Sequence, residues 1–82
     1  MLQLRLTPGE GSAGGPRTFI VRAFEHHLDR RTLTLVCRDG HVGIQLVGHW
    51  HLEARPSSLA PHTVDEVARI HDETPAGLVL VG

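Results

Sequence analysis

The sequence predicts an α+β fold: a small mixed, mostly antiparallel sheet of four to five strands, with one covering helix near the C-terminus. Three observations predict it. Several short segments alternate apolar and polar residues, as half-buried strands do. After residue 62, a helix-capping pattern precedes a segment whose apolar residues recur on one face of a helix. The chain has 82 residues, which is enough for a single domain spanning residues 1–82.

The N-terminal half carries three predicted strands. In residues 2–7 leucine alternates with polar residues, which predicts a strand with one buried face. Residues 8–17 are rich in glycine and proline and predict a flexible loop. Residues 18–24 predict a second strand, and residues 25–31 a polar turn. Residues 32–37 predict a third strand, with two leucines and the single cysteine on its inner face.

The C-terminal half continues the pattern and adds the helix. Arg38-Asp39-Gly40 suits a hairpin turn, and Gly48 is expected to divide the apolar-alternating residues 41–53 into two strands. Thr63 and Glu66 form a capping box that starts the helix. The wholly apolar residues 77–81 predict a buried, central last strand, and the helix before them permits a parallel crossover.

Composition argues against several function classes. The formal net charge is −1, there is no lysine, and the arginines are dispersed, so no nucleic-acid partner is expected. No apolar stretch approaches the roughly 20 residues that span a bilayer, so no membrane association is expected. The N-terminal segment lacks a signal-peptide pattern, and a lone cysteine forms no internal disulfide. We therefore expect a cytoplasmic protein.

The sharpest chemical pattern is the segment His49-Trp50-His51-Leu52-Glu53. On a regular strand His49, His51 and Glu53 share one face, where two imidazoles and a carboxylate are suitable zinc ligands. The alternative interpretation is the solvated face of a strand that buries Trp50 and Leu52. Seven histidines also allow a pH-responsive protein.

Other patterns give little support for an enzyme. The GxGxxG-like segment at residues 9–14 precedes a strand rather than a helix, so it is not a dinucleotide site. Cys37 shares the face of apolar residues and is expected to be buried and inert. No residues converge on a nucleophile or an acid–base couple, and no cofactor is expected unless the histidines bind zinc. We expect a protein without catalytic activity.

Residues 32–82 also resemble STAS domains, the anti-sigma-factor-antagonist type of module. The shared order is a strand, the Arg38-Asp39-Gly40 turn, a strand ending near Gly48, a proline-containing connector, a helix and an apolar strand at residues 78–81. This resemblance implies a regulatory module as one alternative function.

The function we expect first is a protein-interaction or assembly module that binds a protein partner or itself. Exposed apolar strand surface is typical of such modules. The predicted interaction residues are Leu78, Val79, Leu80 and Val81 of the last strand, together with Arg30 and Arg31, which can bind an acidic partner. The histidine-based metal or pH-responsive protein is the alternative.

Overall fold

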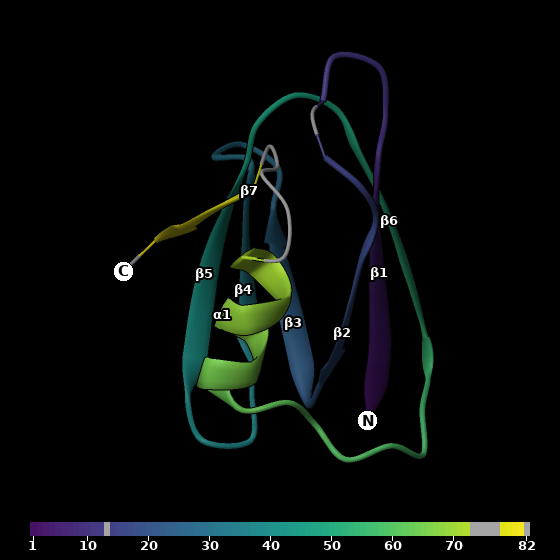
Figure 1. The fold of residues 1–82 in the computed structure, drawn as a ribbon, viewed down its shortest axis with the longest axis vertical. Helices are drawn as coiled ribbons and strands as arrows, with labels where there is room; N and C mark the ends of the chain where they lie inside the picture. The colour runs from purple at the N-terminus through teal and green to yellow at the C-terminus, as the bar shows by residue number, and fades with distance from the viewer. Residues whose placement is uncertain (13, 73–77, 82) are drawn as a thin grey trace.

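The computed structural model describes residues 1–12, 14–72 and 78–81, and it contains seven strands and one helix. The strands form two antiparallel sheets with the orders β2-β1-β6 and β3-β4-β5-β7 (Figure 1). The element bounds are β1 Leu2–Pro8, β2 Arg17–Val21, β3 Ala23–His27, β4 Thr32–Val36, β5 His41–Leu46, β6 Trp50–Pro56, α1 Val64–Asp72 and β7 Leu78–Val81. The predicted α+β class, with one helix near the C-terminus, is confirmed.

The prediction of one mixed sheet is wrong, because the chain changes sheet at two corners. Residues 18–24 are not one strand: β2 ends at Val21 and β3 begins at Ala23, with Arg22 between them. The polar residues that follow continue β3 to His27 rather than forming a turn at once. The second corner lies between Leu46 and Trp50. At each corner the chain bends, so that one continuous segment contributes a strand to each of the two sheets.

Gly48 makes the second corner, as its position in the sequence predicts. Its φ of 84° lies in the left-handed region that favours glycine. A Cβ on Gly48 would lie 2.5 Å from the Ser12 hydroxyl and 2.7 Å from the Gly11 carbonyl oxygen. The loop after β1 therefore packs directly against this corner, and the amide of Gly9 donates a 2.7 Å hydrogen bond to the His49 carbonyl.

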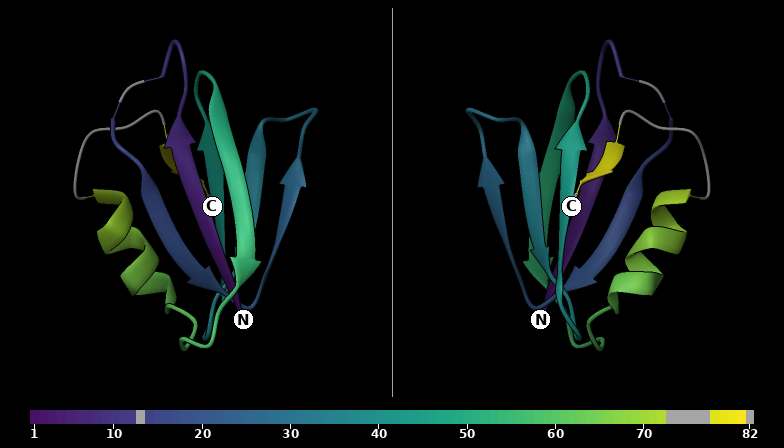
Figure 2. Two further views of the ribbon diagram at one scale, coloured as in Figure 1. Left: turned by 90° about the vertical axis from the view of Figure 1, so that its right-hand side faces the viewer. Right: turned by 90° about the vertical axis from the view of Figure 1, so that its left-hand side faces the viewer.

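The core lies between the two sheets, and the helix covers one open side. Alternate residues of both sheets are buried, as strand geometry requires. The buried apolar cluster consists of Leu4, Leu6, Phe19, Val21, Leu33, Leu35, Cys37, Val42, Ile44, Leu46, Val67 and Leu78. Helix α1 contacts β2 and β5 and inserts Val67, with Val64 and Ile70 beside it. Figure 2 shows α1 and β3 on opposite flanks of the molecule.

Local hydrogen bonds start the helix as the capping box predicts. The Thr63 hydroxyl accepts a 3.2 Å hydrogen bond from the Glu66 amide, and the Glu66 carboxylate accepts a 2.9 Å bond from the Thr63 amide. Asp39, in the turn before β5, accepts a further bond from the Val64 amide. This last contact ties the start of the helix to the second sheet.

The prediction of a central, buried last strand is wrong. Strand β7 pairs antiparallel with β5 and lies at the end of its sheet. Leu78 is buried, but Val79 and Val81 are exposed. The parallel crossover that the helix before this strand permits is therefore not formed. Residue 77, the first residue of the predicted strand, lies outside the described residues.

Candidate functional site

The three residues predicted to bind zinc do not share a face. His49 precedes β6 and lies in the corner after Gly48, where the alternation of a regular strand does not hold. His51 and Glu53 lie on the outer face of β6, opposite Thr7 and Arg5 of β1. Within the described ranges 1–12, 14–72 and 78–81, no group of three histidine, cysteine, aspartate or glutamate residues is placed to hold a metal ion.

Glu53 has a cationic neighbour across the sheet. Glu53 lies directly opposite Arg5 in the β1–β6 pair, and Gln3 lies opposite Arg55 on the same face of these two strands. These four side chains line a shallow hollow of about 150 Å³ on the outer face of the first sheet. Opposite charges on facing strands stabilise a sheet by roughly 0.2–1 kcal/mol. The arrangement is that of a solvated strand face, the alternative interpretation of this segment.

Cys37 is buried, as its shared face with leucines predicts. Burial, with a smaller contribution from the negative charge of Asp39, raises the pKa of the Cys37 thiol. A nucleophilic cysteine requires the opposite, because the thiolate is the reactive form. Its Sγ atom lies 4.0 Å from the Leu35 carbonyl oxygen, and it packs as part of the core.

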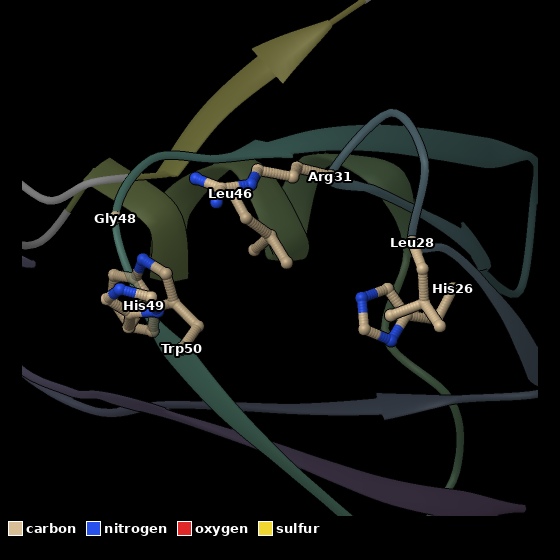
Figure 3. A pocket seen from close by; sticks show the side chains of 7 residues that line it. All are labelled: His26, Leu28, Arg31, Leu46, Gly48, His49 and Trp50. Carbon is tan, nitrogen blue, oxygen red and sulfur yellow. The ribbon is translucent and has the colours of Figure 1, made fainter.

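A second hollow lies on the open side opposite the helix. It has a volume of about 210 Å³ and is lined by His26, Leu28, Arg31, Leu46, Gly48, His49 and Trp50 (Figure 3). We call this hollow the corner groove. Its walls come from β3 and the turn after it on one side, and from the Gly48 corner and the start of β6 on the other. The two sheets thus meet here without a covering element among the described residues.

Trp50 forms one wall of the corner groove with its polar atom already satisfied. Its indole N–H donates a 3.0 Å hydrogen bond to the Val47 carbonyl, three residues back in the chain. The ring also packs against the core cluster. A ring held in this way presents apolar surface to the groove. The opposite wall includes Leu28, whose side chain is 77% exposed.

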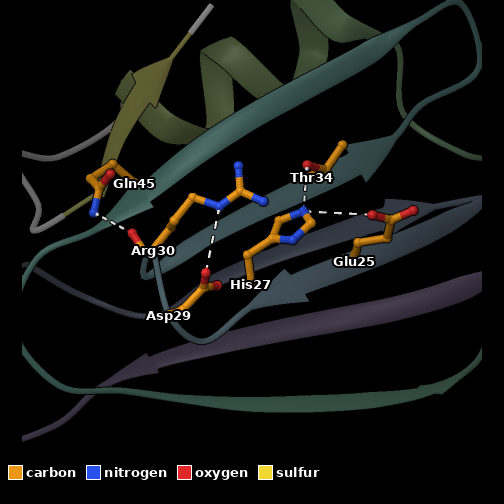
Figure 4. Close-up of polar contacts among 6 residues, drawn as sticks. All are labelled: Glu25, His27, Asp29, Arg30, Thr34 and Gln45. Atoms are coloured by element: carbon orange, nitrogen blue, oxygen red, sulfur yellow. Dashed lines mark hydrogen bonds and ion pairs between the residues drawn. The ribbon is translucent and has the colours of Figure 1, made fainter.

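The turn between β3 and β4 is held rigidly, and it carries Arg30 and Arg31. The side-chain amide of Gln45 donates 3.2 Å hydrogen bonds to the carbonyls of both arginines, and the backbone amide of Leu46 donates a 2.8 Å bond to the Arg31 carbonyl. Figure 4 shows this contact with Arg30 beside the ion pair of Arg30 with Asp29, whose atoms are 4.0 Å apart. Arg31, by contrast, lines the corner groove.

The outer face of the second sheet is mostly uncharged toward β7. On β3, the His27 ring is 3.4 Å from the Thr34 hydroxyl and 3.5 Å from the Glu25 carboxylate (Figure 4). Nearer to β7 the outward positions include Thr32, Thr34 and Gln45, followed by Val79 and Val81. The charged side chains of this face are therefore at the end away from β7.

The corner groove was not predicted from the sequence as a unit. Arg31 was among the predicted interaction residues, and His49 among the predicted metal ligands. Leu28, Leu46 and Trp50 had no site assigned to them. Their convergence depends on the corner at Gly48, which brings residues 46–50 next to the turn at residues 28–31.

Comparison with known proteins adds no functional assignment, since no protein family, curated protein or solved structure matches the chain. No helix within the described ranges is long and apolar enough to cross a membrane.

Proposed function

We propose that this protein is a non-catalytic interaction module that self-associates through the free edge of β7. The observation that carries the proposal is the position of β7 at the end of its sheet, paired on one side with β5. Among the described residues, no strand pairs with its other side. An unpaired strand edge offers backbone donors and acceptors to a further strand.

The side chains of β7 favour this pairing. Val79 and Val81 are 50% and 43% exposed and project from the outer face. The strand contains no charged residue or proline, which are the residues that natural proteins use to block edge pairing. The four residues of β7 bury Leu78 into the core, so the strand is anchored by its own sheet while its outer edge stays available.

A second copy of the chain is the occupant that this edge fits best. Two copies related by a twofold axis would pair β7 with β7 in antiparallel fashion, which continues the antiparallel order of the sheet. The uncharged surroundings of Val79 create no repulsion between identical surfaces. A pair of four-residue strands buries a small area, so we expect weak, concentration-dependent association.

Sedimentation equilibrium over a range of protein concentrations tests the proposal. We expect the wild type to dimerise, and Val79→Arg or Val81→Arg to remain monomeric, because like charges would face each other across the axis. Leu59→Arg is the matched control, since Leu59 is 60% exposed in the connector before the helix. A monomeric wild type at every concentration, or equal loss in the control, would contradict the proposal.

The same experiment separates the histidine-based alternative. It is run once with EDTA and once with excess Zn²⁺. Association in EDTA supports the β7 edge, because strand pairing needs no metal. Association only with Zn²⁺, and its loss in His49→Ala, would instead favour a metal-dependent protein.

A further inference from the structure

We infer that the corner groove binds an extended acidic peptide segment of a partner protein, with one aliphatic side chain inserted against Trp50. The inference concerns a different surface from β7 and does not depend on self-association. It is based on the position of the groove, its charge, its size and the rigidity of its rim.

The position of the groove favours an extended chain. Strand β3 ends one sheet and β6 ends the other, and the corner groove lies between them. On the opposite flank the helix closes the space between sheets with Val67. A peptide strand entering the groove can use the free backbone groups of either edge, as in other cases of strand addition.

The charge of the groove favours a peptide with acidic side chains. Its rim carries the Arg31 guanidinium and the imidazoles of His26 and His49. Among the described residues, the seven that line the groove include no carboxylate. Asp29, on the same turn, does not line the groove, and its carboxylate lies 4.0 Å from the Arg30 guanidinium. Carboxylates of a ligand would meet complementary charge here, and a guanidinium is well suited to bind them.

The size of the groove favours one side chain over a larger small-molecule ligand. Its volume is about 210 Å³. Binding sites for small molecules and cofactors usually measure about 300–1,000 Å³. The walls formed by Leu28, Leu46 and Trp50 are apolar. A leucine-sized side chain, flanked by acidic residues, matches both the volume and the lining.

The backbone of the turn that carries Arg31 is positioned before any ligand arrives. Arg31 has a φ of 52°, in the left-handed region, and three hydrogen bonds from Gln45 and Leu46 hold the carbonyls of its turn. A turn whose backbone is already ordered loses less conformational entropy when the ligand binds. The left-handed φ also supplies a clean test, because glycine adopts it without strain.

The test uses the fluorescence of Trp50, which is the single tryptophan of the chain. The probe is an eight-residue peptide in which glutamate alternates with leucine. The first control peptide has lysine in place of glutamate, and the second has glycine in place of leucine. We expect a saturable change in Trp50 emission with the acidic leucine peptide, and weaker binding of both controls by about tenfold or more.

Variants of the protein locate the binding. Arg31→Gly removes the guanidinium and relieves the left-handed strain, so we expect it to fold at least as well and to bind about tenfold more weakly. Arg30→Ala, the matched control, should bind within about twofold of the wild type because Arg30 does not line the groove. Leu28→Ser should also weaken binding, and since Leu28 is 77% exposed its loss should leave the fold intact.

Several results would overturn the inference. These are the absence of saturation up to the order of 1 mM peptide, equal binding of the lysine peptide, or equal losses in Arg30→Ala and Arg31→Gly. Equal binding of the glycine-containing peptide would show that the groove binds carboxylates without an aliphatic anchor. Val79→Arg should bind the peptide as the wild type does, so a failure of self-association and a failure of peptide binding can be told apart.

Discussion

Gly43 lies directly opposite Val81 in the β5–β7 pair, and a Cβ at position 43 would lie 2.9 Å from Val81 Cγ2 and 3.0 Å from the Val81 carbonyl oxygen. Real Cβ atoms do not approach other atoms this closely. The last strand therefore reaches its place only because β5 has no side chain at this position. The proposed interaction edge depends on one glycine in a different strand.

Substituting Gly43 is expected to release β7. In Gly43→Val, the new side chain forces Val81 away, so backbone amides of residues 78–81 should exchange with deuterium faster, and self-association should be lost. Hydrogen exchange read by mass spectrometry measures the first effect, and sedimentation the second. His41→Val is the control, because position 41 lies on the same strand but outside the β7 register. Unchanged protection of β7 in Gly43→Val would contradict the expectation.

The corner at Gly48 is expected to tolerate no side chain. Gly48→Ala combines left-handed strain with overlap against Ser12 and Gly11, which together should lower the free energy of unfolding by about 2 kcal/mol or more. In a domain of this size that corresponds to a fall of about 10 °C in Tm. Thermal unfolding followed by circular dichroism measures it.

Gly11→Ala separates strain from overlap at the corner. Gly11 also has a positive φ, 83°, but a Cβ there meets nothing within 4 Å. Its substitution should therefore cost only the strain, about 1 kcal/mol. If Gly11→Ala and Gly48→Ala lower the free energy of unfolding by the same amount, overlap with the loop after β1 contributes nothing to the loss at Gly48.

His62 is expected to stabilise the fold by fastening the connector to the edge of β2. Its Nδ1 atom accepts a 3.0 Å hydrogen bond from the Ile20 amide, and its own amide donates a 2.8 Å bond to the Ile20 carbonyl. In His62→Ala the Ile20 amide, belonging to a buried residue, loses its acceptor, which should cost about 1–3 kcal/mol. Urea unfolding measures this loss.

Two further variants check the role of His62. Asn at position 62 can place an oxygen where Nδ1 lies, so His62→Asn should recover part of the loss. Leu59→Ala, in the same connector and exposed, should change the stability by no more than about 0.5 kcal/mol. A loss in His62→Asn as large as that in His62→Ala would argue against the hydrogen bond as the cause.

The capping box is expected to make helix stability depend on pH. Hydrogen bonds from the Thr63 backbone and side chain, followed by electrostatic interactions with His62 and Arg38, lower the pKa of Glu66 from its ordinary value of 4.5. A lowered folded-state pKa means that the ionised carboxylate stabilises the fold above pH 4.5, and that this contribution is lost as the pH falls through the lowered pKa.

Comparing two variants of Glu66 measures that contribution. Glu66→Ala should be less stable than the wild type at pH 7, and the difference should shrink as the pH falls below 4.5. Glu66→Gln keeps a capping acceptor without the charge, so it should be less sensitive to pH than the wild type over the same range. Chemical unfolding at several pH values provides the measurement. A difference between Glu66→Ala and the wild type that stays constant with pH would contradict the expectation.

Much of the local structure was predictable because its causes lie within a few residues. Alternation along residues 2–7 and 32–37 placed the buried leucines on the correct faces, and burial of Cys37 followed from the same rule. The Thr63–Glu66 capping box depends on a single turn of helix. The division of residues 41–53 into two strands at Gly48 depends on a single φ value. Each of these signals acts over a distance shorter than a single element.

The candidate sites were predicted only in part. Arg31 and the exposed residues of β7 were among the predicted interaction residues, because charge and apolarity can be read directly from sequence. His49, His51 and Glu53 were placed on one face by assuming a regular strand through position 49. The corner interrupts that strand, and it brings His49 beside Arg31 and Leu28 instead.

The sequence by itself determined most of the strand segments, where the helix starts and most of the side chains that enter the core, since these follow from periodicity and capping. Only the tertiary structure decided that β2 and β3 belong to different sheets, that β7 is an antiparallel edge strand, and that a groove opens opposite the helix. The reason is that strand pairing is chosen by contacts between distant residues. The space that Gly43 leaves for Val81, and the packing of Ser12 at Gly48, exist only once the whole chain has folded.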